Sequence, residues 1–286
     1  MSGIERVGVV GCGLMGAGIA EVSARAGIDV VVVESTDDAA RAGLERIEGS
    51  LRRAESRGKI PSAEEVLGRI RVVSDLEQLA DRDLVVEAIV EDEAAKSALF
   101  RSLDTIITSP DAILASNTSS IPIMKLAVVT SRPERVMGIH FFNPVPVLSL
   151  VELVPSLLTA DETTEQARHF VQEQLGKRAI DCQDRAGFVV NALLIPFILS
   201  AIRMMESGFA TAEDIDEGLV RGAAHPQGPL ALADLIGLDT TQAVAESLYE
   251  EFKEPLYAPP PLLARMVSAG LLGRKTGRGF YTYEKR

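Results

Sequence analysis

The stretch Arg6-Val7-Gly8-Val9-Val10-Gly11-Cys12-Gly13-Leu14-Met15-Gly16 decides the fold of this chain. Its first part, Arg6 to Val10, reads as a short buried strand, and the segment from Ala17 to Ala26 has the apolar spacing of a helix. A G-x-G-x-x-G pattern that follows a strand and opens a helix is the context that dinucleotide binding requires. The amino-terminal region is therefore predicted to begin a nucleotide-binding α/β domain.

The glycines of this loop have different tasks. Gly11 permits the tight turn, Gly13 lets the backbone approach a pyrophosphate, and Gly16 lets the helix pack closely on the strand. The first N–H groups of the helix are unpaired and the helix dipole is positive at that end, so phosphate binds there. We expect the whole loop, with Leu14 and Met15 included, to bind the cofactor.

A second predicted strand, from Asp29 to Val33, ends in Glu34. This acid follows the glycines by about 20 residues, where a carboxylate can bind the adenosine ribose hydroxyls. A carboxylate there repels a 2′-phosphate, and Ser35-Thr36 supply no cation to bind one. These residues favour NAD over NADP, although Arg41 on the next helix could in principle swing toward a 2′-phosphate.

The chain is acidic, with a formal net charge of −12 in 286 residues and a sequence pI of about 4.9. This charge argues against general binding to nucleic acids or anionic membranes. The length favours two domains over one. Cys12 and Cys182 are far apart and no signal peptide precedes the first strand, which is typical of the reducing cytoplasm and not of a disulfide framework.

Strands and helices alternate through the first part of the chain, which predicts a Rossmann-type, doubly wound and mostly parallel sheet over residues 1–184. After the first two strands, the predicted strands cover residues 71–73, 84–90, 113–116, 135–139, 147–154 and 177–182. The predicted helices between them cover residues 37–59, 62–67 and 93–107.

From Gly187 onward the pattern is helical only, which predicts a smaller all-α domain over residues 185–286. Thr211-Ala212-Glu213-Asp214 resembles a capping box at the start of a helix. The apolar stretch from Phe188 to Met205 is interrupted by Asn191 and Arg203, whereas a membrane span needs about 20 predominantly apolar residues. We interpret this stretch as a buried helix of the second domain.

His140 is one of only 3 histidines and lies in the run Gly138-Ile139-His140-Phe141-Phe142-Asn143-Pro144, with Glu152 shortly after it. A neutral imidazole can accept a proton, and a carboxylate can orient it and stabilise its charged form. Glu91, the residues from Ser116 to Ser119, and His140 all fall just past predicted strand ends. Because ligands of such sheets bind outside the carboxyl ends of the strands, we expect these residues to share one site.

These motifs together resemble the 3-hydroxyacyl-CoA dehydrogenase family, especially its short bacterial 3-hydroxybutyryl-CoA members. The resemblance covers essentially the whole chain in order. The matching segments are 11–16, 85–91, 115–120, 140–147, 150–152, 187–191, 213–216, 225–226, 228–229, 236–239 and 275–281.

The resemblance implies reversible oxidation of an L-3-hydroxyacyl-CoA to the 3-ketoacyl-CoA, with hydride passing to NAD. It makes His140 the base that takes the hydroxyl proton and Glu152 the carboxylate that pairs with the imidazole. It also implies that Ser119 hydrogen-bonds the substrate oxygen and that Asn191, from the second domain, reaches the substrate carbonyl. Acyl chain length is left open.

The resemblance adds further binding residues. Glu91, Lys96, Asn117 and Asn143 are implied on the nicotinamide side of the cofactor, and a homodimer is implied through the helical domain. Because CoA is polyanionic and the chain is acidic, a local basic patch is required. Arg53 and Arg57 are the expected CoA contacts, in a cluster with Arg52 and Lys59. No metal site is expected.

Three alternatives stay open. A related dehydrogenase of the gulonate type, or one for hydroxyadipyl-CoA, would use the same glycine loop and His–Glu pair. A dinucleotide-binding protein without catalysis could keep the fold, and the chain could be a module of a larger oxidation complex.

The sequence also departs from the family at Ala186, Ala192 and Gln227, which bears on domain closure and not on His140 or Glu152.

Overall fold

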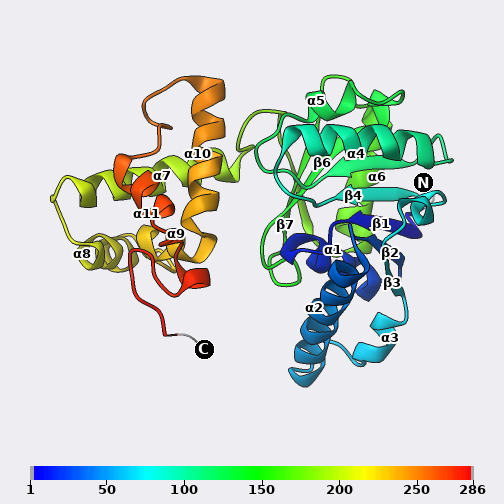
Figure 1. Cartoon of the computed structure of the whole chain (residues 1–286), viewed down its shortest axis with the longest axis horizontal. Coiled ribbons are helices and arrows are strands. Elements are labelled where there is room, and N and C mark those ends of the chain that lie inside the picture. Colours follow the sequence, from blue (N-terminus) through cyan, green and yellow to red (C-terminus); the bar gives the residue numbers. More distant parts are fainter. Residues whose placement is uncertain (1–2, 285–286) are drawn as a thin grey trace. The chain divides into compact units, whose positions relative to one another are not determined.

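Residues 6–33 form the strand, helix and strand that the glycine pattern predicts, namely β1 (Arg6–Val10), α1 (Leu14–Arg25) and β2 (Asp29–Val33). The computed structural model describes residues 3–284. The chain divides into two units, residues 1–185 and 186–286. Figure 1 shows a sheet flanked by helices in the first unit and an assembly of helices in the second.

The first unit is built on one eight-stranded sheet in the order β3-β2-β1-β4-β5-β6-β7-β8. Neighbouring strands are parallel except β6 and β7, which pair antiparallel. This confirms the predicted mostly parallel, doubly wound sheet. The remaining strands are β3 (Ile70–Val73), β4 (Leu84–Glu87), β5 (Ile113–Ser116), β6 (Val136–Phe141), β7 (Leu150–Pro155) and β8 (Arg178–Asp181).

The register aligns the carboxyl ends of the parallel strands in the middle of the sheet. Val10 of β1 pairs with Glu87 of β4, Glu87 pairs with Ser116 of β5, and Ser116 pairs with Gly138 of β6. The loops that follow β1, β4 and β5 therefore begin beside one another. In open sheets of this kind, ligands bind along that edge.

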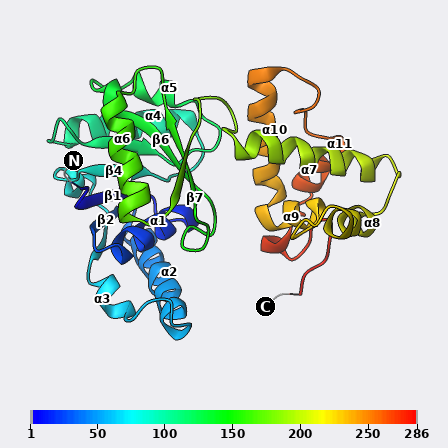
Figure 2. The same cartoon turned by 180° about the vertical axis from the view of Figure 1, so that it is seen from behind.

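Helices cover both faces of the sheet. In Figure 1, α4 (Glu93–Ile106) and α5 (Ile123–Ala127) lie in front of it, and α6 (Asp161–His169) comes to the front in Figure 2. Residues of α1 and α6 belong to the same hydrophobic core. Because both faces are covered, central strands such as β2 are almost entirely apolar and buried. The shorter α3 (Ala63–Leu67) follows α2 (Asp37–Ser56).

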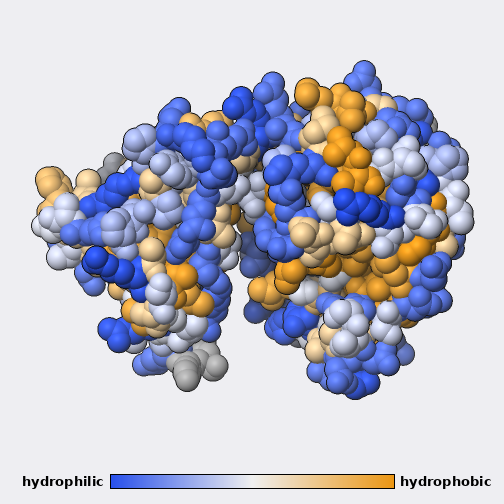
Figure 3. All heavy atoms as spheres, turned by 45° about the horizontal axis from the view of Figure 1, so that its top comes forward, coloured by the Kyte–Doolittle hydropathy of each residue, from blue (hydrophilic) through white to orange (hydrophobic). Residues whose placement is uncertain are grey.

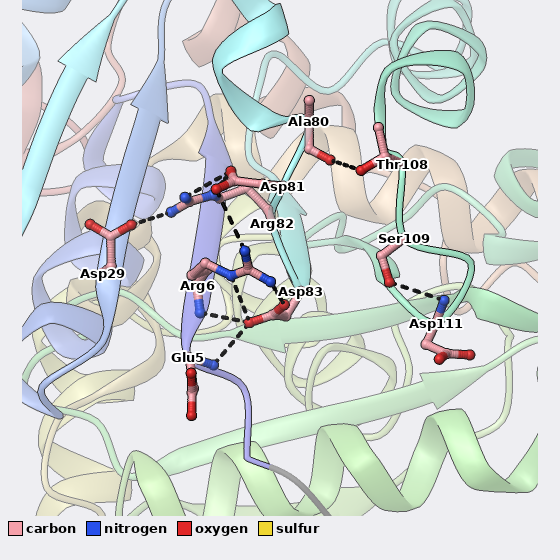
Figure 4. Close-up of polar contacts among 10 residues, drawn as sticks. All are labelled: Glu5, Arg6, Asp29, Ala80, Asp81, Arg82, Asp83, Thr108, Ser109 and Asp111. Atoms are coloured by element: carbon pink, nitrogen blue, oxygen red, sulfur yellow. Dashed lines mark hydrogen bonds and ion pairs between the residues drawn. The ribbon is translucent and has the colours of Figure 1, made fainter.

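Charged side chains fasten the amino-terminal ends of the central strands (Figure 4). Arg6, at the start of β1, donates to Asp83 Oδ1 at 2.7 Å. The side chain of Arg82 is buried, and it pairs with Asp29 at 2.5 Å and with Asp81 at 2.8 Å. Because a buried charge is tolerated only when it is paired, these contacts hold β1, β2 and the start of β4 together at the edge opposite the loops.

The two predicted strand limits that lie furthest from the structure are each wrong by three residues, and hydrogen bonds in the loops explain both. β4 ends at Glu87, earlier than predicted, because the Glu87 carboxylate accepts the N–H of Ile89 at 2.8 Å and turns the chain out of the sheet. β7 begins at Leu150, later than predicted, because the N–H of Val147 donates to the carbonyl of Pro144 at 2.9 Å in a turn.

The second unit is organised around α7 (Val190–Glu206), so the apolar stretch is a helix as predicted, but it is buried on one side only, since Leu193 and Met204 are exposed. Thr211 caps the next helix by accepting the N–H of Asp214 at 3.1 Å, as the capping pattern predicts. The other helices are α8 (Ala212–Glu217), α9 (Pro229–Ile236), α10 (Leu238–Phe252) and α11 (Pro261–Ser268). Within residues 3–284, every helix is too short or too polar to cross a membrane.

Candidate active site

His140 and Glu152 form a buried pair on neighbouring strands. Nδ1 of His140 lies 2.7 Å from Oε2 of Glu152. His140 is 5% exposed and Glu152 is 0% exposed, so solvent screens this contact weakly. A carboxylate at this distance fixes the tautomer of the imidazole and stabilises its protonated form.

The antiparallel pairing of β6 with β7 brings the two side chains together. His140 and Glu152 are direct partners in this register, and such partners project from the same face of a sheet with Cβ atoms about 4.5–5.5 Å apart. β6 extends to Phe141, so the expectation that His140 lies just past the strand end was wrong. Phe142 packs edge-on against the imidazole, with ring centroids 4.6 Å apart. The strand backbone therefore determines the geometry of the pair.

The glycine-rich loop has the shape that a dinucleotide needs. Gly11 has a φ of +92°, a region that side chains rarely adopt. A Cβ on Gly16 would lie 1.8 Å from the carbonyl oxygen of Gly11, so only glycine allows α1 to approach β1 this closely. A Cβ on Gly13 would meet nothing within 4 Å. This open space beside the first N–H groups of α1 fits a pyrophosphate. Leu14 and Met15 begin α1 there, and Leu14 is exposed.

We expect Gly16→Ala and Gly13→Ala to fail in different ways. Gly16→Ala should destabilise the fold by about 1–3 kcal/mol or more, because its Cβ overlaps the backbone of Gly11. Gly13→Ala should leave the melting temperature unchanged and weaken binding of NADH, because its methyl group occupies the open space. Thermal unfolding and NADH fluorescence titration of both variants would test this. Equal melting temperatures for wild type and Gly16→Ala would contradict it.

Glu34 lies against the glycine-rich loop at the end of β2. Its Oε1 accepts the N–H of Cys12 at 2.5 Å, and its Oε2 accepts the N–H of Ser35 at 3.1 Å. In this fold an acid at this position binds the ribose hydroxyls of NAD. Arg41, the candidate cation for a 2′-phosphate, forms an ion pair with Asp38 instead. The loop, the helix end and Glu34 together fit NAD.

The turn from Thr118 to Ser120 is organised around the carboxylate of Glu91. Glu91 Oε1 accepts the N–H of Ser119 at 3.1 Å and the hydroxyl of Ser120 at 2.8 Å, and it also accepts the hydroxyl of Thr118. The side chain of Ser119 is partly exposed, and its hydroxyl makes no hydrogen bond within residues 3–284. Glu91 thus fixes the backbone of the residue that is expected to bind the substrate oxygen.

Lys96 belongs to a buried ion-pair network beneath this turn. Its Nζ lies 2.5 Å from Glu87 Oε1 and 3.1 Å from Glu91 Oε2, and Lys96 is 1% exposed. Burial would raise the pKa of Glu91, but Lys96 and the neighbouring hydroxyls hold it below its ordinary value. Lys96 therefore keeps Glu91 ionised. The predicted contact of Lys96 with the cofactor stays a prediction.

The three predicted asparagines have different surroundings. Asn117 Oδ1 accepts the N–H of Phe141 at 2.8 Å, which ties the turn after β5 to the end of β6. Asn143 is exposed on the loop between β6 and β7. Asn191 lies in the first turn of α7, in the other unit, and is half-buried. Its expected contact with the substrate stays a prediction.

The predicted CoA patch lies at the carboxyl end of α2. Arg53 and Arg57 are exposed, and neither forms an ion pair in the part of the chain that the structure describes. Arg52 pairs with Glu48 along the helix. Arg53 and Arg57 are thus available to phosphate groups, whose geometry suits bidentate contacts with arginine.

Sequence reasoning missed the buried partners of these residues. Glu87 is fully buried and accepts the hydroxyl of Ser116 at 2.5 Å. The sequence did offer a signal for this contact, because Glu87 is an acid at the end of the apolar strand β4, and a buried acid needs a polar partner. The contact of Arg46 with Cys12 was also missed, since it joins a helix to a loop with no pattern in the sequence.

Among residues 3–284, no group of three potential metal ligands is found.

Two family models match the chain in succession. The model described as 3-hydroxyacyl-CoA dehydrogenase, NAD binding domain, matches residues 6–185. The model described as 3-hydroxyacyl-CoA dehydrogenase, C-terminal domain, matches residues 187–283. Together they span both structural units.

Characterised and solved proteins are similar over the same length. A 3-hydroxybutyryl-CoA dehydrogenase of Mycobacterium tuberculosis is 59% identical over 282 residues, covering 98% of this chain and 99% of that protein. The crystal structure of (S)-3-hydroxybutyryl-CoA dehydrogenase PaaH1 from Ralstonia eutropha has a TM-score of 0.92 at 46% identity, covering 99% of this chain and 100% of the other. A solved diketoreductase has a TM-score of 0.87 at 30% identity, covering 99% of this chain and 100% of the other.

Proposed function

This chain belongs to the 3-hydroxyacyl-CoA dehydrogenase family, and from that premise we propose that it oxidises 3-hydroxybutyryl-CoA reversibly to the 3-ketoacyl-CoA with NAD. The observation that carries the proposal is the buried contact of 2.7 Å between His140 Nδ1 and Glu152 Oε2. A general base of this kind suits a reaction that removes a hydroxyl proton.

His140 and Glu152 act together on the substrate hydroxyl. Because Nδ1 faces Glu152, Nε2 takes the hydroxyl proton during oxidation and returns it during reduction. Glu152 stabilises the imidazolium that forms. NAD, held by the glycine-rich loop and Glu34, would supply the acceptor for the hydride that leaves the substrate carbon. Oxidation thus needs neutral His140, and reduction needs its protonated form.

Other side chains position the two reactants. The Ser119 hydroxyl donates a hydrogen bond to the substrate oxygen. The carboxylate of Glu91 fixes the backbone of Ser119 by accepting a hydrogen bond from the Ser119 N–H group. We propose that Asn191 donates a hydrogen bond to the substrate carbonyl. Asn117, Asn143 and Lys96 would hold the nicotinamide side of the cofactor.

The choice of a CoA ester is supported by Arg53 and Arg57. Both cations are exposed at the end of α2 in a chain whose net charge is −12. A polyanionic substrate needs such a local positive patch to bind an acidic protein. Arg53→Ala and Arg57→Ala are the variants that separate binding of CoA from the chemistry.

The test is oxidation of NADH, followed by absorbance, with acetoacetyl-CoA, with free acetoacetate and with a keto sugar acid. Turnover of the CoA ester that far exceeds turnover of either free acid supports the proposal, and Arg53→Ala should raise KM for the ester with little change in kcat. Turnover of the free sugar acid alone would overturn it in favour of a gulonate-type enzyme. NADH binding without turnover of any substrate would favour a protein that only binds the dinucleotide.

A second candidate is reduction of dicarbonyl compounds without CoA. It is favoured by the likeness to the solved diketoreductase, which is 30% identical. Including a free 3,5-diketo ester in the assay distinguishes the two, because Arg53→Ala should not affect a substrate that lacks phosphate groups.

We also propose a homodimer through the helical unit, supported by an apolar stripe along α7. Leu193 is 73% exposed and Met204 is 42% exposed, and Phe197 lies between them on the same side of the helix. Orange areas interrupt the hydrophilic surface of this unit in Figure 3. Light scattering should give a dimer for wild type and a monomer for Leu193→Asp. Leu157→Asp, at a 94% exposed position of the first unit, is the matched control. A monomeric wild type would contradict this.

We place the enzyme in the cytoplasm. Cys12 and Cys182 lie far apart in the sequence and both are buried, which suits a reducing compartment. Fractionation of the source cells with an antibody to the chain tests this placement.

A further inference from the structure

Two hydrogen bonds converge on Cys12, the second residue of the glycine-rich loop. Its N–H donates to Glu34 Oε1 at 2.5 Å, and its carbonyl oxygen accepts from Nη1 of Arg46 at 2.5 Å. A Cβ on Gly43 would lie 2.6 Å from its Sγ. The carboxylate of Glu34 and the guanidinium of Arg46 therefore both contact this one loop residue, and the guanidinium comes from α2.

The guanidinium of Arg46 retains donors for a ligand. Arginine has five N–H donors, and the contact with Cys12 is the hydrogen bond that Arg46 makes within residues 3–284. No carboxylate in that part of the chain pairs with it, and the residue is exposed. Arg41, earlier on α2, is paired with Asp38. Arg46 is thus a cation beside the loop whose charge is not neutralised by an ion pair.

The position of Arg46 relative to Glu34 bears on the choice of cofactor. In dinucleotide-binding folds an acid at the end of the second strand binds the ribose 2′-hydroxyl, and a nearby arginine accommodates a 2′-phosphate. This chain has both kinds of group next to the same residue, Cys12. Glu34 repels a 2′-phosphate, whereas Arg46 attracts it.

We propose that Arg46 is a further specificity-determining residue of the adenosine ribose site. Arg46 binds the 2′-phosphate of NADP and so limits the preference for NAD over NADP that Glu34 imposes. The inference rests on the proposed NAD-dependent function. It predicts measurable affinity for NADPH, weaker than for NADH, that depends on Arg46 and falls as salt screens the exposed charge.

The test is fluorescence titration of NADH and NADPH with the full chain, at low and high salt. The chain contains no tryptophan, so the signal followed is the emission of the reduced nicotinamide as it changes on binding. Wild type is compared with Arg46→Ala and Arg46→Gln, and Arg41→Ala is the matched control on the same helix. Circular dichroism melting verifies that each variant is folded.

Arg46→Ala should raise the Kd of NADPH about tenfold, the size expected for one charge-assisted hydrogen bond, and should raise the Kd of NADH by less than about threefold. Arg41→Ala should change neither. An equal rise for both cofactors would overturn the inference, because Arg46 would then contact a part they share. No change in either would also overturn it. Wild type that binds neither cofactor would instead overturn the proposed function.

Discussion

His140→Gln should lower kcat about 10²- to 10⁴-fold in both directions, the range that general acid–base catalysis contributes. Glutamine preserves much of the side-chain volume but cannot take up and return the proton at neutral pH. The buried carboxylate of Glu152 would retain a hydrogen-bond donor, so the fold should survive. The measurement is steady-state reduction of acetoacetyl-CoA by NADH, with the reverse reaction in the same buffer.

His169→Gln is the matched control for this variant. His169 ends α6, and no role in the reaction is assigned to it. It should keep wild-type kcat, and His140→Gln should keep wild-type affinity for NADH, because His140 is not among the residues assigned to the dinucleotide. A His140→Gln enzyme within a fewfold of wild-type kcat, with chemistry shown to limit the rate, would remove His140 from the mechanism.

Glu152→Gln should lower kcat about 10²-fold or more, with a much smaller change in the Kd of NADH. An amide cannot stabilise the imidazolium, and its NH₂ group can select the wrong imidazole tautomer. Because Glu152 is fully buried and its Oε2 lies 2.7 Å from Nδ1, solvent cannot replace the lost charge. Stopped-flow measurement of the hydride transfer step would separate this effect from product release.

Glu162→Gln, at an exposed position of α6, is the control for Glu152→Gln.

The two directions of the wild-type reaction should also respond oppositely to pH. Oxidation should slow as protons occupy His140 at low pH, and reduction should slow as His140 loses its proton at high pH. Unchanged kcat, or flat pH profiles in both directions when chemistry limits the rate, would contradict the assigned roles.

Local patterns predicted the parts of the molecule that depend on neighbouring residues. The glycine loop could be read from the sequence because its turn, its close packing and its helix end involve only residues 6–26. Thr211 was recognisable for the same reason, since a cap bonds to a backbone group three residues later. The resemblance to a family then assigned roles to residues that no local pattern joins.

Contacts between distant segments were not predictable in this way. Lys96 reads as a helix residue, yet its Nζ reaches Glu87 and Glu91 in a buried network. The strand limits near Ile89 and Val147 depend on hydrogen bonds that form only in the folded loops.

The sequence by itself determined the alternation of strands and helices, the cofactor loop and the presence of a histidine followed by a carboxylate. The tertiary structure decided that His140 and Glu152 face each other, because this depends on the antiparallel register of β6 and β7, and a shift of one residue would turn one side chain to the opposite face. It also decided that Arg46 and not Arg41 contacts Cys12, the loop residue whose N–H donates to Glu34. Helix packing on the loop sets that contact, and the spacing of charges along α2 does not encode it.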